Sequence, residues 1–271
     1  MRNTHNNLFI CLGLAEIIEK ILFFLDFDGD GNADIIVTTD NSIELWKNMG
    51  TDKEIEQKFK NVKNISYPMT CTSGKCKIGQ FAFADFNLDG KLDVIVPICP
   101  DSQCSDSKIF FATMEDLLKK SSVEQHVFKE MTIDLRTHRF DFEEEDTIYN
   151  AMTPRIGDID LDGYPDLLIR VKNPSSLKKK THLLLNFNVD HEDETRKSSL
   201  KRGFVLQEEV MPTESDSTMV MATFYDLYEN GNEDIILVQK YGNDKYKIEA
   251  LTNSTQDSDA YFVKVIVLTG R

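Results

Sequence analysis

The hydrophobic and polar positions of this chain follow a unit that occurs four times. Each unit contains a polar, Asp-rich turn followed at once by three or four consecutive apolar residues. The four copies are DFDGDGNADIIV at 26–37, DFNLDGKLDVIV at 85–96, DIDLDGYPDLLI at 158–169 and DLYENGNEDIIL at 226–237. Successive copies begin 59, 73 and 68 residues apart. Recurrence at this spacing indicates a repeat protein in which each copy marks one structural unit.

The apolar residues around each turn predict β-strands. Those directly after the turns are rich in β-branched residues and too short for helices. A short apolar or alternating run precedes the second, third and fourth turns, and a further strand-like segment follows every unit. These following segments are SIELWKN at 42, KIFFAT at 108, THLLLNF at 181 and KIEALTN at 247, with FKEMT at 128 and FVLQEEV at 204 as candidate fourth strands. Consecutive apolar positions need cover on both faces of a strand, which sheets stacked face to face provide. The predicted fold is therefore all-β: a partial β-propeller with about four blades.

The repeats divide the chain into two regions. Residues 26–271 form the predicted propeller, and residues 1–25 form a separate N-terminal segment. The stretch LFICLGLA in that segment loosely resembles a signal peptide, but it is short and no clear small-residue cleavage site follows it. A start site within a longer gene, or a local core segment, explains it better. No run of the chain approaches the roughly 18 apolar residues that a membrane-spanning helix needs.

The polar turns have the spacing of a loop that wraps around Ca²⁺. Oxygen-bearing side chains stand at positions 1, 3, 5 and 9 of the motif, and glycine at position 6 permits a sharp turn. Alternate side chains point inward, and the carbonyl group of position 7 adds a further oxygen. The expected ligands are Asp26, Asp28, Asp30, Asn32 (carbonyl) and Asp34 in the first loop; Asp85, Asn87, Asp89, Lys91 (carbonyl) and Asp93 in the second; and Asp158, Asp160, Asp162, Tyr164 (carbonyl) and Asp166 in the third.

The fourth turn departs from this pattern, because Tyr228 stands at position 3 and Asn230 at position 5. We expect this loop to keep its shape through hydrogen bonds and to bind no ion. Ligand charge then ranks the first and third loops above the second. An EF-hand is excluded, since its loop needs a bidentate glutamate at position 12. That position is apolar in all four copies: Val37, Val96, Ile169 and Leu237.

The negative net charge and the absence of catalytic motifs reduce the number of possible functions. The net charge of -15, from 46 acidic and 31 basic residues, argues against nucleic acid as a partner. Asp-rich turns without metal are the alternative to calcium sites, but up to four carboxylates in one loop would repel one another without a cation. The chain contains no GxSxG, HExxH, P-loop or CxxC motif, and its five histidines are scattered. We therefore expect a protein that is not an enzyme.

Four of the five cysteines flank the second motif. Cys71 and Cys76 precede it and Cys99 and Cys104 follow it, five residues apart in each pair. A hairpin around the second turn brings both pairs to the same end of one blade. Of the three possible pairings we favour the two local ones, Cys71–Cys76 and Cys99–Cys104, over a tetrahedral zinc site. Cys11 is left over.

Two acceptor sequons for N-glycosylation lie in polar segments: Asn64-Ile65-Ser66 and Asn253-Ser254-Thr255. Each alone is weak evidence, because sequons also occur by chance. Together with paired cysteines and calcium loops they indicate the secretory route.

The stretch FADFNLDGKLDVIVP at 83 resembles the FG-GAP repeat of integrin-α propellers, in which the calcium loop joins the first two strands of a blade. The stretches GDIDLDGYPDLLI at 157, MVMATFYDLYENGNEDIILV at 219 and DAYFVKVIVLTG at 259 resemble the T-cell immunomodulatory protein family, also called Linkin, over residues 26–271. The resemblance implies an extracellular propeller, attached to the membrane by a C-terminal span, that binds protein partners at the cell surface in cell adhesion and in modulating T cells. The sequence here contains no such span.

Two other functions remain open. A secreted propeller could bind carbohydrate, although the single tryptophan, Trp46, argues against a stacking platform of several rings. An intracellular scaffold is the second alternative, and free thiols with unglycosylated sequons would favour it.

Overall fold

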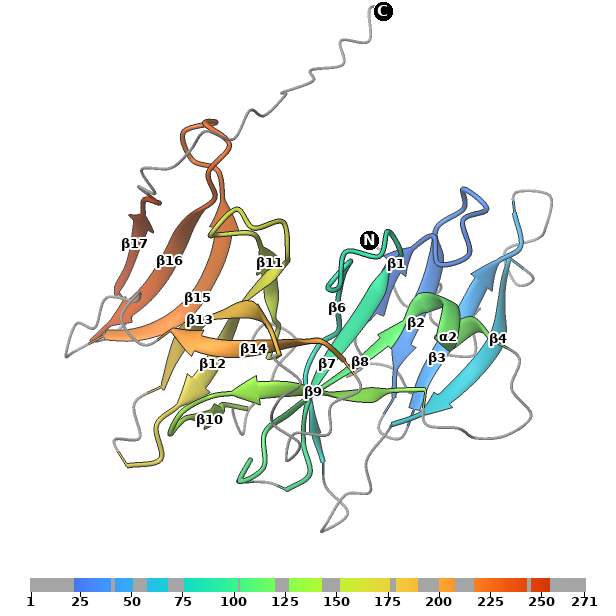
Figure 1. The fold of residues 1–271 in the computed structure, drawn as a ribbon, viewed down its shortest axis with the longest axis horizontal. Helices are drawn as coiled ribbons and strands as arrows, with labels where there is room; N and C mark the ends of the chain where they lie inside the picture. Colours follow the sequence, from blue (N-terminus) through green and yellow to red (C-terminus); the bar gives the residue numbers. More distant parts are fainter. Residues whose placement is uncertain are drawn as a thin grey trace, which may run out of the picture.

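The computed structural model describes residues 22–39, 42–50, 58–67, 76–101, 103–119, 127–142, 152–175, 179–189, 200–207, 217–242 and 245–253. These residues form antiparallel β-sheets that follow one another along the chain as the blades of a partial β-propeller. In Figure 1 the blades run from β1–β4 at the right of the view to β15–β17 at the left. The predicted all-β propeller fold is confirmed.

The first blade is a four-stranded sheet in the order β1-β2-β3-β4. Its strands are β1 (Leu22–Leu25), β2 (Asp34–Thr38), β3 (Ser42–Asn48) and β4 (Phe59–Ser66). Strand β1 pairs with the buried strand β2, Leu22 lying opposite Val37. The sheet therefore begins four residues before Asp26, inside the segment that the sequence placed outside the propeller.

The second blade surrounds the long buried strand β7 (Asp93–Cys99). The short strands β5 (Lys77–Ile78) and β6 (Ala82–Ala84) both pair with one side of β7, and β8 (Lys108–Thr113) pairs with the other. β9 (Lys129–Asp134) completes the blade. A helix that the sequence did not predict, α2 (Met114–Leu118), follows β8. The Thr113 side chain caps this helix by accepting a hydrogen bond from the backbone N–H of Asp116.

The third blade joins the second through an unexpected strand pair. Its strands are β10 (Arg139–Phe140), β11 (Arg155–Gly157), β12 (Asp166–Lys172), β13 (Lys179–Asn188) and β14 (Arg202–Gln207). β14 pairs in parallel with β9, so the two blades form one ten-stranded sheet. Gly203 makes this possible, because a Cβ atom there would lie 2.5 Å from the carbonyl oxygen of Thr132.

The fourth blade contains β15 (Ser217–Tyr225), β16 (Asp234–Tyr241) and β17 (Lys245–Leu251). These strands form an antiparallel sheet in chain order. In every blade one copy of the Asp-rich turn joins two consecutive strands: β1 to β2, β6 to β7, β11 to β12 and β15 to β16. Within the described ranges, no helix has the length and apolar character to cross a membrane.

Three hydrophobic cores lie between successive blades. Along β7, Val94 and Val96 belong to the core between blades 1 and 2, whereas Ile95 belongs to the core between blades 2 and 3. Along β12, Leu167 and Leu168 divide in the same way between the second and third cores. These strands bury both faces, as their consecutive apolar residues predicted. Because full burial of one such side chain contributes about 1.5–3 kcal/mol, much of the free energy of folding comes from contact between blades.

Candidate functional site

All four Asp-rich turns occupy the same place in their blades. Loop 1 (26–33) joins β1 to β2, loop 2 (85–92) joins β6 to β7, loop 3 (158–165) joins β11 to β12, and loop 4 (226–233) joins β15 to β16. The pairing of the two strands continues to the ends of each loop, as with Leu25 opposite Asp34 and Gly157 opposite Asp166. Each loop is therefore held at both ends by a hydrogen-bonded strand pair.

The four loops share one backbone conformation. The glycine at position 6 has a left-handed φ in every copy, from +78° at Gly90 to +86° at Gly163 and Gly231. Position 4 is also left-handed, although only loop 1 has glycine there; the other residues are Leu88, Leu161 and Glu229. Non-glycine residues seldom adopt this conformation, so the surrounding loop must enforce it.

Hydrogen bonds inside each loop enforce this shape. The carboxylate at position 1 accepts a hydrogen bond from the N–H of the glycine at position 6, at 2.7 Å in loops 1 and 2 and 2.9 Å in loops 3 and 4. The side chain at position 5 accepts one from the N–H of position 7, at 2.8–3.0 Å. Loop 4 keeps both bonds although it has fewer carboxylates.

The buried aspartate at position 9 connects the end of each loop to its beginning. Asp34, Asp93, Asp166 and Asp234 are at most 1% exposed. Each accepts a hydrogen bond at 3.1–3.2 Å from the N–H of position 2. In loops 1, 3 and 4 the other oxygen accepts a second bond, at 2.7–2.8 Å, from the N–H of an asparagine on the neighbouring strand or just after it: Asn48 of β3, Asn186 of β13 and Asn253 after β17. This aspartate is thus a structural clamp as well as a candidate ligand.

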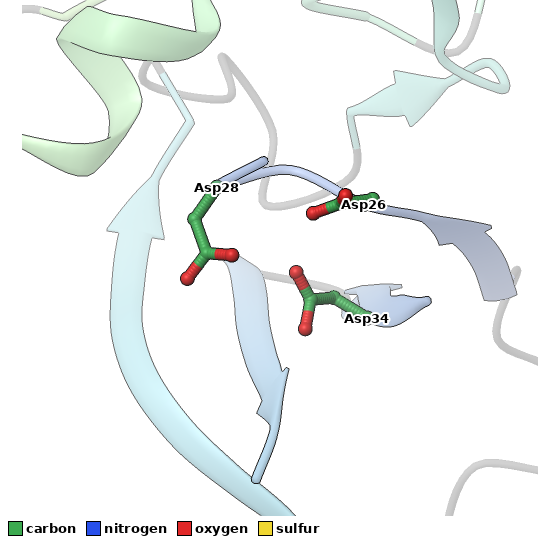
Figure 2. Close-up of side chains that lie close together, drawn as sticks. All are labelled: Asp26, Asp28 and Asp34. Atoms are coloured by element: carbon green, nitrogen blue, oxygen red, sulfur yellow. The ribbon is translucent and has the colours of Figure 1, made fainter. Parts of the chain in front are cut away.

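Carboxylates converge in loops 1 and 3. Oxygen atoms of Asp26, Asp28 and Asp34 lie within 4.8 Å of one another, as do those of Asp158, Asp160 and Asp166. Figure 2 shows the three loop-1 side chains directed toward a common centre. Loop 2 has Asn87 at the middle position of this triplet. Such oxygen clusters are the donors that Ca²⁺ prefers.

Loops 2 and 3 also contain buried oxygens with capacity to bind a cation. Among the described residues, Asp93 Oδ1 and Asp158 Oδ1 are buried without a hydrogen-bond partner. Burial, together with the charge of the neighbouring loop carboxylates, raises the pKa of both Asp93 and Asp166 to about 7. Partial desolvation, together with the charge of neighbouring loop carboxylates, likewise raises the pKa of Asp158 and of Asp160. A divalent cation would favour the ionised form of these groups, so the residues of loops 2 and 3 fit calcium.

Loop 4 differs at the positions that the sequence singled out. Tyr228 is 64% exposed, and Asn230 Oδ1 accepts a hydrogen bond from the backbone N–H of Asn232 at position 7. Asp226 and Asp234 keep their structural hydrogen bonds. The loop therefore has the shape of the others without their cluster of charge.

Asparagines and a glutamate that sequence reasoning missed connect the loops of neighbouring blades. Asn186 Nδ2 donates to the carbonyl oxygen of Phe86 in loop 2 (3.1 Å), and Asn253 Nδ2 donates to that of Ile159 in loop 3 (2.7 Å). Glu233 of loop 4 accepts a hydrogen bond from the N–H of Asp158 (2.8 Å). The recurring Asn in SIELWKN, THLLLNF and KIEALTN was the available sequence signal.

A cavity of about 410 Å³ lies between loops 2 and 3. Its apolar wall contains Phe111, Met131 and Leu200, and its basic side contains Lys201 and Arg202. The Arg202 guanidinium lies 3.4 Å from the centre of the Tyr164 ring and donates to Asn186 Oδ1 at 2.9 Å. Asn87, Asp89 and Tyr164 place both loops at its edge.

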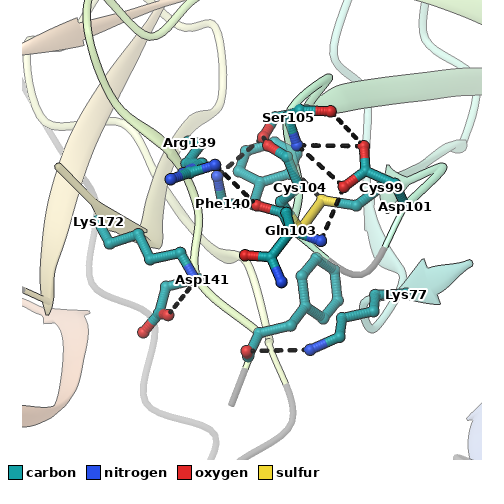
Figure 3. The surroundings of a disulfide bond; sticks show 12 residues. Lys77, Cys99, Asp101, Gln103, Cys104, Ser105, Arg139, Phe140, Asp141 and Lys172 are labelled. Atoms are coloured by element: carbon teal, nitrogen blue, oxygen red, sulfur yellow. Dashed lines mark hydrogen bonds and ion pairs between the residues drawn. A yellow bond between two sulfur atoms is a disulfide. The ribbon is translucent and has the colours of Figure 1, made fainter. Parts of the chain in front are cut away.

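The structure contains a disulfide between Cys99, at the end of β7, and Cys104. Figure 3 shows Asp101 beside it; this carboxylate accepts a hydrogen bond from the N–H of Gln103 at 2.7 Å. Cys76 is disulfide-bonded as well. Cys71 and Cys11 lie outside the described residues, so the pairing Cys71–Cys76 stays a prediction.

The two sequons have different surroundings. Asn64 is exposed on β4, where its Oδ1 accepts a hydrogen bond from Asn61. Asn253 is half-buried, and its Nδ2, the atom that would carry a glycan, donates to Ile159. Asn64 is therefore the more accessible acceptor.

Comparison with known proteins agrees with this architecture. A family model described as FG-GAP-like repeat matches residues 26–96, which include loops 1 and 2. Over 91% of its length the chain is 32% identical to the T-cell immunomodulatory protein of Mus musculus and 30% identical to that of Homo sapiens. The chain is a homologue of the T-cell immunomodulatory proteins. It is also 23% identical over 255 residues to protein linkin of Caenorhabditis elegans.

The chain spans 39% of the length of the mouse and human T-cell immunomodulatory proteins. No solved structure matches it. The relation to these proteins and the FG-GAP-like repeats support a protein-interaction domain.

Proposed function

We propose that this chain is part of a calcium-stabilised, non-enzymatic β-propeller that binds protein partners on the extracellular side of the cell. The observation that carries the proposal is the repeated loop: one backbone conformation in four blades, with clustered carboxylates where the motif supplies them. Calcium at these loops would be structural, because it would hold the two strands that flank each loop at their common end. Loop 3 has the strongest support, since it combines a carboxylate triplet with a buried oxygen that has no hydrogen-bond partner among the described residues.

Calcium removal tests this proposal. Extracellular calcium modules have dissociation constants of roughly 0.1–1 mM, so each site filled at about 1 mM calcium would add about 0.4–1.4 kcal/mol to the free energy of unfolding. We expect calorimetric titration to detect binding to the folded chain and the melting temperature to fall in chelator. No heat of binding, together with equal melting temperatures in calcium and chelator, would refute the calcium role.

The partner is expected to be a protein at the cell surface, as the relation to the T-cell immunomodulatory proteins implies. The disulfide Cys99–Cys104 supports an oxidising, extracellular location over an intracellular scaffold. A C-terminal membrane span is expected of the whole protein by that relation. A pull-down from cell-surface extracts, with calcium and with chelator, tests the interaction. Capture that is equal in chelator would separate partner binding from the calcium loops.

A further inference from the structure

Loop 1 already contains a cation supplied by the protein. The Lys47 ammonium forms an ion pair with Asp28 and a second one with Asp30, 3.0 Å from its Oδ2. Asp28 and Asp30 stand at positions 3 and 5 of the motif, which are two of the expected calcium ligands. Two cations held by the same carboxylates repel each other, so Ca²⁺ would have to displace the ammonium group.

The register of the sheet places this lysine at loop 1; in loop 3, among the described residues, the motif carboxylates have a single long ion pair, 3.9 Å from Arg202 to Asp162 Oδ2. Ile35 pairs with Trp46, which places Lys47 directly across from the buried Asp34 at position 9. Residues that lie opposite each other on neighbouring strands project from the same face, so Lys47 reaches the loop. The same register position in blades 2, 3 and 4 is occupied by uncharged residues: Thr113, Leu185 and Thr252.

The hydrogen bonds of loop 1 agree with this difference. Asp26 Oδ1 accepts from the N–H groups of Gly29 and Asp30, and Oδ2 accepts from that of Gly31. Both oxygens of Asp34 are also used, by the N–H groups of Phe27 and Asn48. In the described part of the chain, loops 2 and 3 each have a buried carboxylate oxygen without a hydrogen-bond partner, and loop 1 has none. Lys47 and the backbone thus satisfy loop 1 without a metal ion.

We infer that Lys47 is a built-in replacement for calcium in loop 1, so that this blade is stabilised at any calcium concentration while loops 2 and 3 depend on the ion. The inference rests on the proposed calcium role of the other loops. It also changes the ranking by ligand charge, in which loops 1 and 3 were equal: loop 3 binds calcium and loop 1 does not.

Terbium, a luminescent probe for calcium sites, can report on loop 1 alone. Trp46 is the only tryptophan of the chain and is adjacent to Lys47, so excitation of tryptophan sensitises an ion in loop 1 selectively. We expect wild type to give little such signal. Lys47→Leu introduces the residue found at this register position in blade 3. Its dissociation constant for terbium should be lower than that of wild type by on the order of tenfold, because the two ion pairs of Lys47 no longer compete with the ion. Lys47→Arg keeps the charge and should behave as wild type.

Lys60→Leu is the matched control. Lys60 lies opposite Lys47 on β4, is exposed, and has no ion pair among the described residues. It removes the same charge from the same region without touching the loop carboxylates, so it should leave the signal low. If Lys47→Leu does not fold, Lys47→Gln removes the charge while keeping a polar side chain.

The outcomes separate this inference from the proposed function. Strong tryptophan-sensitised binding by wild type, or equal tightening by Lys60→Leu and Lys47→Leu, would overturn the role of Lys47. A folded Lys47→Leu variant that binds no ion, in a protein whose wild type is stabilised by calcium, overturns the inference alone. If wild type gains no thermal stability from calcium but Lys47→Leu binds terbium, the part of the inference that concerns Lys47 and loop 1 stands, whereas the calcium dependence of loops 2 and 3 and the proposed function fail.

Discussion

At the scale of the residue, the side chains at positions 1, 5 and 9 of the repeated turn have structural roles that do not need a metal. Position 1 holds the glycine N–H, position 5 holds the N–H of position 7, and position 9 is buried beneath the loop. Loop 4 retains these bonds after losing two of the expected ligand carboxylates. The pattern read as ligand spacing is therefore also a pattern of backbone hydrogen bonds, and variants must be chosen to separate the two.

Asp234→Ala tests the structural task where no ion is expected. The substitution leaves the N–H groups of Leu227 and Asn253 without their acceptor. One buried unsatisfied donor costs about 1–3 kcal/mol, so we expect a loss of at least that size in the free energy of unfolding. Urea unfolding should show the same loss in calcium and in chelator. A loss confined to calcium would mean that loop 4 binds the ion after all.

Asp160→Asn tests the ligand role in loop 3. Asp160 stands at position 3 and is exposed, and the hydrogen bond that its Oδ1 accepts from the N–H of Asp162 is long, at 3.4 Å. Calorimetry should show one calcium site fewer, with a melting temperature that is lower than wild type in calcium and unchanged in chelator. Tyr228→Asn, at the same position of loop 4, is the control and should not alter stoichiometry. An Asp160→Asn variant with full stoichiometry would remove loop 3 from the calcium sites.

At the scale of the element, the blades follow from strands that are apolar on both faces, but the joint between blades 2 and 3 does not. The parallel pair β9–β14 brings the backbones so close that position 203 has no space for a side chain. β14 begins at Arg202, and Lys201 directly precedes it. These two residues form the basic side of the cavity between loops 2 and 3. This strand pair therefore positions that cavity.

Gly203→Val should separate β14 from β9. The new Cβ would lie 2.5 Å from the carbonyl oxygen of Thr132 and 3.1 Å from Val189. Overpacking of this kind costs typically about 1–3 kcal/mol. Hydrogen exchange should show lost protection in β9 and β14 and retained protection between β12 and β13. Lys201→Val, the control, introduces valine at an exposed position two residues earlier and should leave protection unchanged in all four strands. If both variants reduced the protection of β9 and β14 equally, the close approach of the backbones at Gly203 would not be the cause.

At the scale of the whole molecule, contacts between blades make the loops interdependent. Asn253 of blade 4 and Glu233 of loop 4 both hydrogen-bond to loop 3, and Asn186 of blade 3 bonds to loop 2. Loops 2 and 3 are thus each supported by the blade that follows them. The same arrangement decides which sequon is available, because Asn253 is part of such a contact and Asn64 is not.

In a secreted form of the chain, we expect a glycan on Asn64 and none on Asn253. Asn64→Gln should abolish the mobility shift produced by glycosidase, whereas Asn253→Gln should preserve it. Gel mobility before and after glycosidase treatment measures both. Asn253→Gln should also lower the melting temperature, because it removes the bond to Ile159. A glycan found on Asn253 would contradict this prediction. It would mean that Asn253 does not form the hydrogen bond to Ile159, or forms it only in chains that escape glycosylation.

The sequence by itself determined the all-β repeat, the loop between two consecutive strands of each blade, and the anomaly of loop 4. These features depend on local spacing: glycine at position 6, oxygen ligands at alternate positions, and apolar triplets such as Val94–Val96 that require cover on both faces. Strand β1 was missed because its apolar residues continue a longer apolar segment, so only its pairing with β2 separates it. Tertiary structure alone placed Lys47 among the carboxylates of loop 1, Gly203 against Thr132, and Asn186 and Asn253 against the loops of preceding blades. Those contacts depend on cross-strand register and on the packing of one blade against the next, which join residues far apart in the chain and leave no periodic trace in it.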